Sequence, residues 1–192
     1  MYLIAGLGNP GLKYRNTRHN VGFEVINLWA KSLGTRLSGR RFESRNTRTT
    51  FQEKSVILLR PLTFMNQSGK SIRACVDYFN LRAEDILVIH DDIDLPLGKM
   101  RVVRNGGAGG HKGILSVVHH LGTHEFPRLK IGVGRPRYDG ESIEDYVLSP
   151  FYPDEKEIIQ EVLQLAIRAC ELFVAHGIDT AMNEINYQNL TK

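Results

Sequence analysis

Apolar residues follow two different spacings along the 192-residue chain, and the alternation between them predicts the fold. Short continuous apolar runs, typical of buried strands, cover residues 2–5, 55–59, 86–89, 99–103 and 129–133. Apolar residues three and four apart predict helices over 21–32, 66–80, 111–121 and 153–177, with a final turn or two in 179–186. Strands alternating with helices indicate an α/β protein, a single-domain three-layer α/β/α structure over residues 1–192.

Two segments lack a clear period. Residues 136–149 are polar and acidic, which predicts a mobile lid or connector around 136–150. Residues 35–50 hold five arginines against Glu43 alone, so we expect a basic loop there. Cys75 and Cys170 fall in helix-like patterns and are expected to be reduced core residues.

The net charge of +4 conceals a strong asymmetry along the chain. Residues 1–138 hold 22 basic and 10 acidic residues, a balance of +12, whereas residues 139–192 hold 3 and 11, a balance of −8. A strongly basic region favours a polyanionic partner, and the nearly acid-free stretch 99–137 favours nucleic acid. No apolar run approaches the ~20 residues that span a bilayer, and no signal peptide is visible, so we expect a cytoplasmic protein.

The first apolar run leads into a glycine-rich loop. Gly6, Gly8 and Gly11 match the dinucleotide-binding fingerprint by letter. That fingerprint needs a helix that begins inside the motif, facing the pyrophosphate. Here Pro10 and several further residues precede the helical periodicity, so a nucleotide site is disfavoured.

The chain has seven histidines, of which His19 lies in the loop between the first strand and the first helix. Asn9 lies in the same loop, and Asn20 is expected to cap the helix. An imidazole can take a proton from water near neutral pH. Asp91, two residues after the strand at 86–89, is its best partner, because a carboxylate fixes the ring tautomer and stabilises the imidazolium. The residues alone do not show that the two side chains meet.

Other chemistries have less support. Ser68 has no evident base, and neither cysteine lies in a loop motif, so a covalent mechanism is disfavoured. The histidine and carboxylates of the segment 90–94 could bind a hard metal by composition. However, successive residues leaving a strand point in different directions, and no second cluster completes a coordination shell. We therefore expect no metal and no cofactor.

Four motifs follow one another along the chain: GLGNPGLKYRNTRHNVG at 6–22, PLTFMNQSG at 61–69, HDDIDLPLG at 90–98 and GGAGGHKG at 106–113. Their order and spacing resemble those of bacterial-type peptidyl-tRNA hydrolases over most of the chain. The resemblance implies a mixed, twisted central sheet. It also implies an esterase that acts on peptidyl-tRNA and releases free tRNA and peptide, as well as a contact between His19 and Asp91.

The same resemblance implies roles for individual residues. His19 would act as general base on water, oriented by Asp91, while Asn9 and Asn66 would bind the substrate and polarise the ester. Further substrate contacts are expected from Tyr14, Phe64, Met65, Asn66, His111 and Lys112. Contacts with tRNA phosphates are expected from Lys99, Arg101, Arg104, Arg128 and Lys130.

Two residues depart from the family's common pattern. Lys112 stands where asparagine is common, and Val103 stands at an often basic position. A cation at position 112 beside His19 would disfavour the protonated imidazole; alternatively, Lys112 meets a tRNA phosphate or only solvent.

Two other functions stay open at this point. One is a non-catalytic RNA-binding relative, since the family fold has also been recruited as an organellar splicing factor. The other is a different ester or peptide hydrolase, because fold alone does not select a substrate. We expect a monomer in each case.

Overall fold

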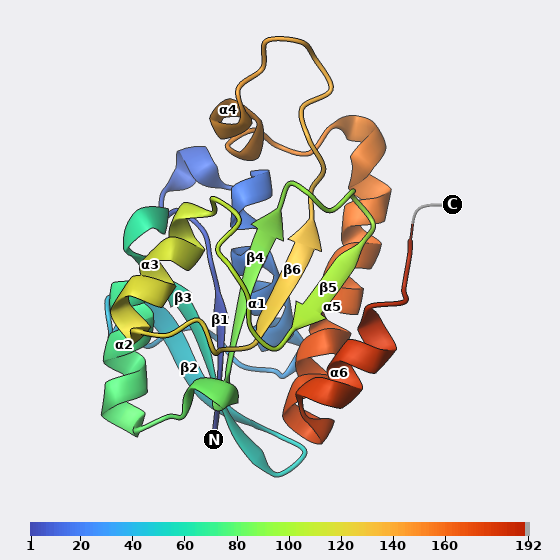
Figure 1. Cartoon of the computed structure of the whole chain (residues 1–192). Helices are drawn as coiled ribbons and strands as arrows, with labels where there is room; N and C mark the ends of the chain where they lie inside the picture. Colours follow the sequence, from blue (N-terminus) through green and yellow to red (C-terminus); the bar gives the residue numbers. More distant parts are fainter. Residues whose placement is uncertain (191–192) are drawn as a thin grey trace.

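In the computed structural model of the chain, which describes residues 1–190, six strands form one mixed sheet in the order β2-β3-β1-β4-β6-β5 (Figure 1). The strands are β1 (Tyr2–Gly6), β2 (Ser44–Phe51), β3 (Lys54–Pro61), β4 (Ile86–Asp92), β5 (Met100–Val103) and β6 (Arg128–Gly132). The four central strands run parallel, and the edge strands β2 and β5 run antiparallel to their neighbours. The predicted mixed sheet is therefore confirmed.

Helices cover both faces of this sheet (Figure 1). The helices are α1 (Val21–Ser32), α2 (Ser68–Phe79), α3 (Lys112–Leu121), α4 (Ile143–Val147), α5 (Lys156–His176) and α6 (Ile178–Ile185). Short 3₁₀ turns are η1 (Leu12–Tyr14), η2 (Arg18–Asn20), η3 (Met65–Gln67), η4 (Ala83–Asp85) and η5 (Pro153–Glu155). Helices α1, α5 and α6 bury one face, whereas α2 and α3 bury the other. The three-layer α/β/α architecture is confirmed.

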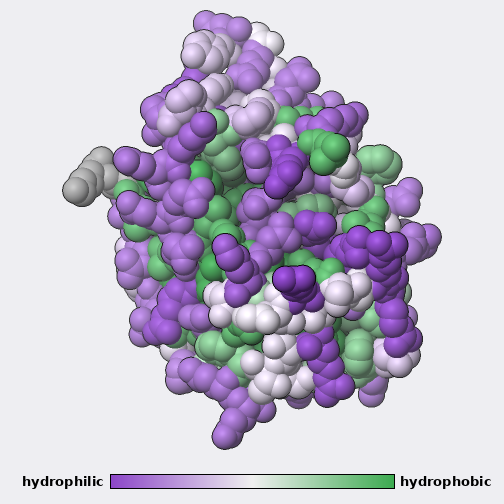
Figure 2. Space-filling model, turned by 180° about the vertical axis from the view of Figure 1, so that it is seen from behind, coloured by the Kyte–Doolittle hydropathy of each residue, from purple (hydrophilic) through white to green (hydrophobic). Residues whose placement is uncertain are grey.

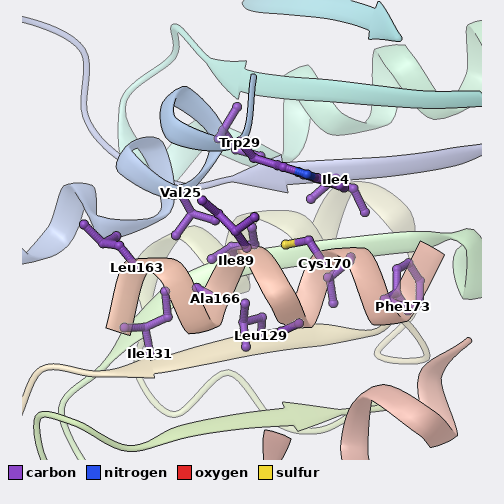
Figure 3. Close-up of a cluster of buried hydrophobic side chains, with 14 of the residues drawn as sticks. Ile4, Val25, Trp29, Ile89, Leu129, Ile131, Leu163, Ala166, Cys170 and Phe173 are labelled. Carbon is purple, nitrogen blue, oxygen red and sulfur yellow. The ribbon is translucent and has the colours of Figure 1, made fainter. Parts of the chain in front are cut away.

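The larger core lies between α1, α5 and the sheet (Figure 3). Trp29 of α1 and Cys170 of α5 pack there with Ile4 of β1 and Ile89 of β4, all four fully buried. Cys75 lies in the core on the opposite face, and burial raises its pKa to about 12. Both cysteines are thus buried, free thiols, as the helical pattern predicts.

Two strand predictions needed correction. Of the arginine-rich segment 35–50 expected as a loop, residues 35–43 lie outside the helices and strands, whereas the rest belongs to the edge strand β2. The residues of β2 are mostly only partly buried, so this strand lacks an apolar signature. Its hairpin to β3 turns at Gln52 and Glu53, with φ of 44° and 64°, as a two-residue hairpin requires. Strand β4 continues three residues beyond the predicted end, because its polar tip still pairs with β6 through Asp92.

Seen from behind, the surface is mostly hydrophilic, with smaller apolar patches (Figure 2). No helix within residues 1–190 has both the length and the apolar character needed to cross a membrane. Exposed large apolar side chains nevertheless occur in segments that follow β1 and β3 and in and beside α4, namely Leu12, Leu62, Phe64, Ile143 and Leu148. The first three extend beyond the carboxyl ends of two parallel strands.

Two glycines set the distance between α1 and the sheet. A Cβ at Gly6 would lie 2.0 Å from the carbonyl oxygen of Gly22, and one at Gly22 would lie 2.6 Å from the carbonyl oxygen of Ile89. Backbone therefore packs directly on backbone where α1 begins, so the preceding turn η2 is held against the ends of β1 and β4.

We expect Gly22→Ala to lower the free energy of unfolding by about 2–3 kcal/mol, because the added methyl group must displace backbone rather than a flexible side chain. Gly107→Ala is the matched control, since a Cβ at Gly107 meets no atom within 4 Å. Urea unfolding of both variants measures the difference. Equal stabilities for the two would contradict the close approach.

Candidate active site

A cavity of about 500 Å³ opens beside the carboxyl ends of β1 and β4. From β1 the chain passes through α1 and β2 to β3, which lies on one side of β1, whereas β4 lies on the other side of β1. The cavity therefore lies at the position where open α/β sheets bind ligands. Its polar lining includes Asn9, His19, Asp91 and His111, from three separate segments of the chain and β4.

The carboxylate of Asp91 is hydrogen-bonded to two imidazole rings. His19 Nδ1 lies 2.9 Å from each carboxylate oxygen, and His111 Nε2 lies 3.0 Å from Oδ1. Asp91 is 2% exposed. Burial by itself would raise the Asp91 pKa, but His19 and His111 outweigh it and hold that pKa well below its usual range. Asp91 is therefore an anion that accepts hydrogen bonds from both rings.

The hydrogen bonds determine which nitrogen of each ring carries the proton. His111 Nδ1 accepts from the backbone N–H groups of Gly113 and Ile114, at 3.1 and 3.2 Å, so its proton lies on Nε2 and points at Asp91. His19 Nδ1 faces the ionised carboxylate and must donate to it. Its Nε2 is left with the lone pair, on a ring that lines the cavity. His19 can therefore act as a base toward water.

Asp91, His19 and His111 are also the one group of potential metal ligands found among residues 1–190. Their ligand atoms lie within 4.8 Å of one another. Metal binding at His111 Nε2 would move its proton to Nδ1, where two backbone donors already point. Asp92 is hydrogen-bonded to Lys130 at 2.7 Å and is not part of this cluster. The donor set thus fits a hydrogen-bonded cluster better than a metal centre.

Asn9 is held in one orientation. Its backbone N–H donates to Asn20 Oδ1 at 2.8 Å, and Asn20 Nδ2 returns a bond to the Asn9 carbonyl at 3.0 Å. Its side-chain Oδ1 accepts from the Met65 backbone N–H at 2.8 Å. The amide Nδ2 remains as a donor beside the cavity. Asn20 occupies the N-cap position of α1, as predicted, but its side chain makes no cap bond and instead fixes Asn9.

His90 packs against both Asp91 and His111. Its side chain is 2% exposed, its Nδ1 lies 2.7 Å from the Asp91 carbonyl oxygen, and its ring centroid lies 4.8 Å from that of His111. Burial, aided by His111, lowers the His90 pKa to about 3. His90 is therefore a neutral packing partner at neutral pH and not a second acid or base.

Comparison with known proteins identifies the family. A family model described as Peptidyl-tRNA hydrolase matches residues 3–192. The chain belongs to the peptidyl-tRNA hydrolase family. It is 46% identical over 186 residues to the Peptidyl-tRNA hydrolase of Bacillus subtilis (strain 168), covering 97% of this chain and 98% of that protein. The corresponding protein of Halalkalibacterium halodurans is 43% identical, covering 97% of this chain and 100% of its own.

A solved structure shows the same fold. The crystal structure of peptidyl-tRNA hydrolase from Acinetobacter baumannii is similar with a TM-score of 0.92 at 34% identity, covering 100% of this chain and 97% of that one. The fold and the family inferred from the four sequence motifs are confirmed.

Among the residues that the family resemblance suggested, the structure brings Asn9, His19, Asp91, His111 and Lys112 to one cavity. The contact of His111 with Asp91 was not anticipated, and its position just before a helix was the available signal, since that is where a side chain caps backbone N–H groups.

Four other candidates for substrate contact do not line the cavity, namely Tyr14, Phe64, Met65 and Asn66. Met65 is 4% exposed and belongs to the core, so its predicted substrate contact is corrected: its backbone N–H orients Asn9. Asn66 is exposed on the same turn, outside the cavity lining. Phe64 is 58% exposed and Tyr14 is half-buried, both also outside the lining.

The candidate phosphate contacts differ in availability. Lys99 and Arg101 are exposed, whereas Arg104 pairs with Asp179 and Lys130 with Asp92. Arg128 is fully buried and donates to the carbonyl oxygens of Gly107 and His124, at 2.6 and 3.3 Å. Its predicted phosphate contact is therefore corrected, because its guanidinium anchors the glycine loop from inside.

Lys112 pairs with Glu144 of α4 at the rim of the cavity. Both side chains are largely exposed. The Glu144 carboxylate therefore offsets the positive charge of Lys112, which was one of the effects on His19 considered from the sequence. The ion pair instead joins the start of α3 to the segment 136–150.

His90 makes stability depend on pH. The unfolded chain takes up a proton on this histidine below about pH 6.5, whereas the folded chain does so only near its pKa of about 3. Stability is therefore lost as the pH falls through that window. Between pH 6.5 and 5, we expect wild type to lose about 1.5 kcal/mol more than His90→Asn, which keeps a donor but does not titrate.

Urea unfolding of both proteins at several pH values measures this difference. The Asp91 carboxylate, whose pKa is lowered in the folded state, contributes stability above about pH 4 that is lost only at lower pH. The chosen window therefore excludes the titration of Asp91, and the comparison with His90→Asn isolates the contribution of His90. Parallel stability curves for the two proteins would contradict the assignment.

Proposed function

We propose that this chain hydrolyses the ester bond of peptidyl-tRNA, with His19 as general base, and releases free tRNA and peptide. Family membership supports the overall reaction. The observation that carries the mechanism is the hydrogen bond from His19 Nδ1 to Asp91, which leaves Nε2 unprotonated beside the cavity.

In the first step, His19 Nε2 takes a proton from water as the water oxygen attacks the ester carbonyl carbon. The carbonyl π electrons move onto oxygen, and Asn9 Nδ2 is placed to donate to that oxyanion. In the second step, the bond to the ribose oxygen breaks and that oxygen takes the proton from the imidazolium. Asp91 stays ionised throughout and stabilises the imidazolium.

We further propose that residues 136–150 form a lid over this reaction. Ile143, Val147 and Leu148 line the cavity from its α4 side, and the Lys112–Glu144 pair joins the lid to the opposite rim. A lid that excludes bulk water strengthens the electrostatic contacts inside the site.

Asn66, Phe64 and Tyr14 are proposed to contact parts of the substrate that extend beyond the cavity. Asn66 and Phe64 flank Met65, whose backbone is bound to Asn9. A side chain exposed at this rim can bind peptide groups or stack on the terminal adenine. We also propose that the protein acts as a monomer in the cytoplasm, where translation generates its substrate.

His19→Ala should lower the rate of peptide release from an N-blocked aminoacyl-tRNA by about 10²–10⁴-fold, as expected for loss of a general base. Binding of that tRNA should change little, because phosphate contacts supply most of the affinity. Unblocked aminoacyl-tRNA is the control substrate for wild type.

Near-normal turnover in folded His19→Ala would falsify the base assignment. If wild type binds tRNA without releasing peptide, the chain is an RNA-binding relative. Equal hydrolysis of blocked and unblocked substrates would indicate a less selective esterase.

Binding of tRNA should weaken as the salt concentration rises. Lysines and arginines that contact phosphates displace counterions from the tRNA, and this release is less favourable at high salt. Arg101→Ala should reduce the log–log salt slope by about one, since Arg101 is exposed on the edge strand β5. Arg82→Ala is the matched control, an exposed arginine that precedes β4 at the other end of the sheet. Equal slopes in wild type and Arg101→Ala would place the phosphate contacts elsewhere, including the basic strand β2.

A further inference from the structure

Arg18 immediately precedes His19 in η2, yet its side chain is fully buried and does not line the cavity. Its guanidinium instead reaches the segment that follows α4. Nη1 donates to Ser149 Oγ at 2.8 Å and to the Pro150 carbonyl, and Nη2 donates to Glu155 at 2.6 Å. A buried cation beside the proposed base thus joins the catalytic turn to the proposed lid.

Aromatic rings enclose this guanidinium. The Arg18 Cζ atom lies 4.1 Å from the ring centroid of Tyr146 and 4.5 Å from that of Tyr152. Tyr146 belongs to α4 and donates from its hydroxyl to the Val133 carbonyl at 2.6 Å, just beyond β6. The planar Arg18 group is therefore fixed by stacking as well as by its hydrogen bonds.

Glu155 joins both ends of the lid to Arg18. Its side chain is 4% exposed and accepts from Arg18 and from the Tyr152 backbone N–H at 2.8 Å through Oε2. Its Oε1 accepts from Arg137 at 3.0 Å. Arg137 lies where the lid leaves the sheet, and Ser149 lies where the lid returns.

The turn itself is held on both sides of His19. Asn20 is bonded to Asn9, and Arg18 is bonded to the lid base through its side chain and through its backbone N–H, which donates to the Ser149 carbonyl at 3.1 Å. His19 stands between these two buried anchors and points at Asp91.

We propose that Arg18 is a positioning residue for hydrolysis, which sets the orientation of the His19 ring by tying its turn to the base of the lid. A buried ion pair is a weak source of stability, because an apolar group of similar volume often serves equally well. A bidentate, stacked arginine instead specifies geometry, and a displacement of about 1 Å at a catalytic group can cost about 10²-fold in rate.

This inference rests on the proposed role of His19 and is tested in the full chain with Arg18→Lys, which keeps the charge but loses the planar fork. With N-blocked aminoacyl-tRNA as substrate, kcat should fall by about 10–100-fold while KM changes by less than about three-fold. If Arg18 acts through the His19–Asp91 pair, the same change in an Asp91→Asn background should cost less than about three-fold.

Lys54→Met is the control for a merely structural loss. Lys54 donates to the last carbonyls of α5, at Val174 and Ala175, away from the cavity. The Lys54→Met variant should have a lower melting temperature than wild type and an unchanged kcat. Should Arg18→Lys fail to fold, Ser149→Ala removes one of the same hydrogen bonds and should lower kcat several-fold, with the same dependence on Asp91.

An unchanged kcat in the folded variant, or an equal fold-loss in both Asp91 backgrounds, would overturn the inference. The His19→Ala variant separates the two proposals. If it abolishes turnover while Arg18→Lys leaves kcat intact, only the positioning role fails. If His19→Ala retains turnover, the base assignment itself fails.

Discussion

The structure depends on one buried carboxylate that accepts hydrogen bonds from two imidazoles. Asp91 is held ionised inside the protein because His19 and His111 both donate to it. Removal of either ring would leave part of a buried charge without a partner, which is costly. The same interaction leaves His19 Nε2 unprotonated beside the cavity. A requirement of folding, that a buried anion be satisfied, thus also leaves an imidazole nitrogen able to accept a proton, as the proposed mechanism requires.

Much of the fold follows from the sequence, because the central strands and the packed faces of the helices carry strong apolar signals. The predicted bounds of α1 agree with the structure, and the cavity opens beside the carboxyl ends of two parallel strands. His19 and Asp91 could be selected individually from loop position and residue type. Their contact could not, since no local pattern shows which strand ends lie side by side. The family motifs supplied that pairing.

The features that the sequence did not predict have physical causes. Strand β2 is a partly solvated edge, so its arginines and threonines read as a loop. Arg128 and Arg18 are fully buried, although charge alone places arginine at the surface. Each is paired with partners far away in sequence or with loop carbonyls, which composition does not reveal. The Lys112–Glu144 pair likewise joins segments 32 residues apart.

The most direct test of the central interaction is the protonation state of individual ring nitrogens. ¹⁵N chemical shifts of the histidine rings, recorded where both rings are neutral and assigned with His19→Ala and a His111 variant, report the tautomer of each. The account predicts opposite tautomers, with the proton of His19 on Nδ1 and that of His111 on Nε2. A proton on Nε2 of His19 would contradict it, because that ring could then neither donate to Asp91 nor accept a proton from water.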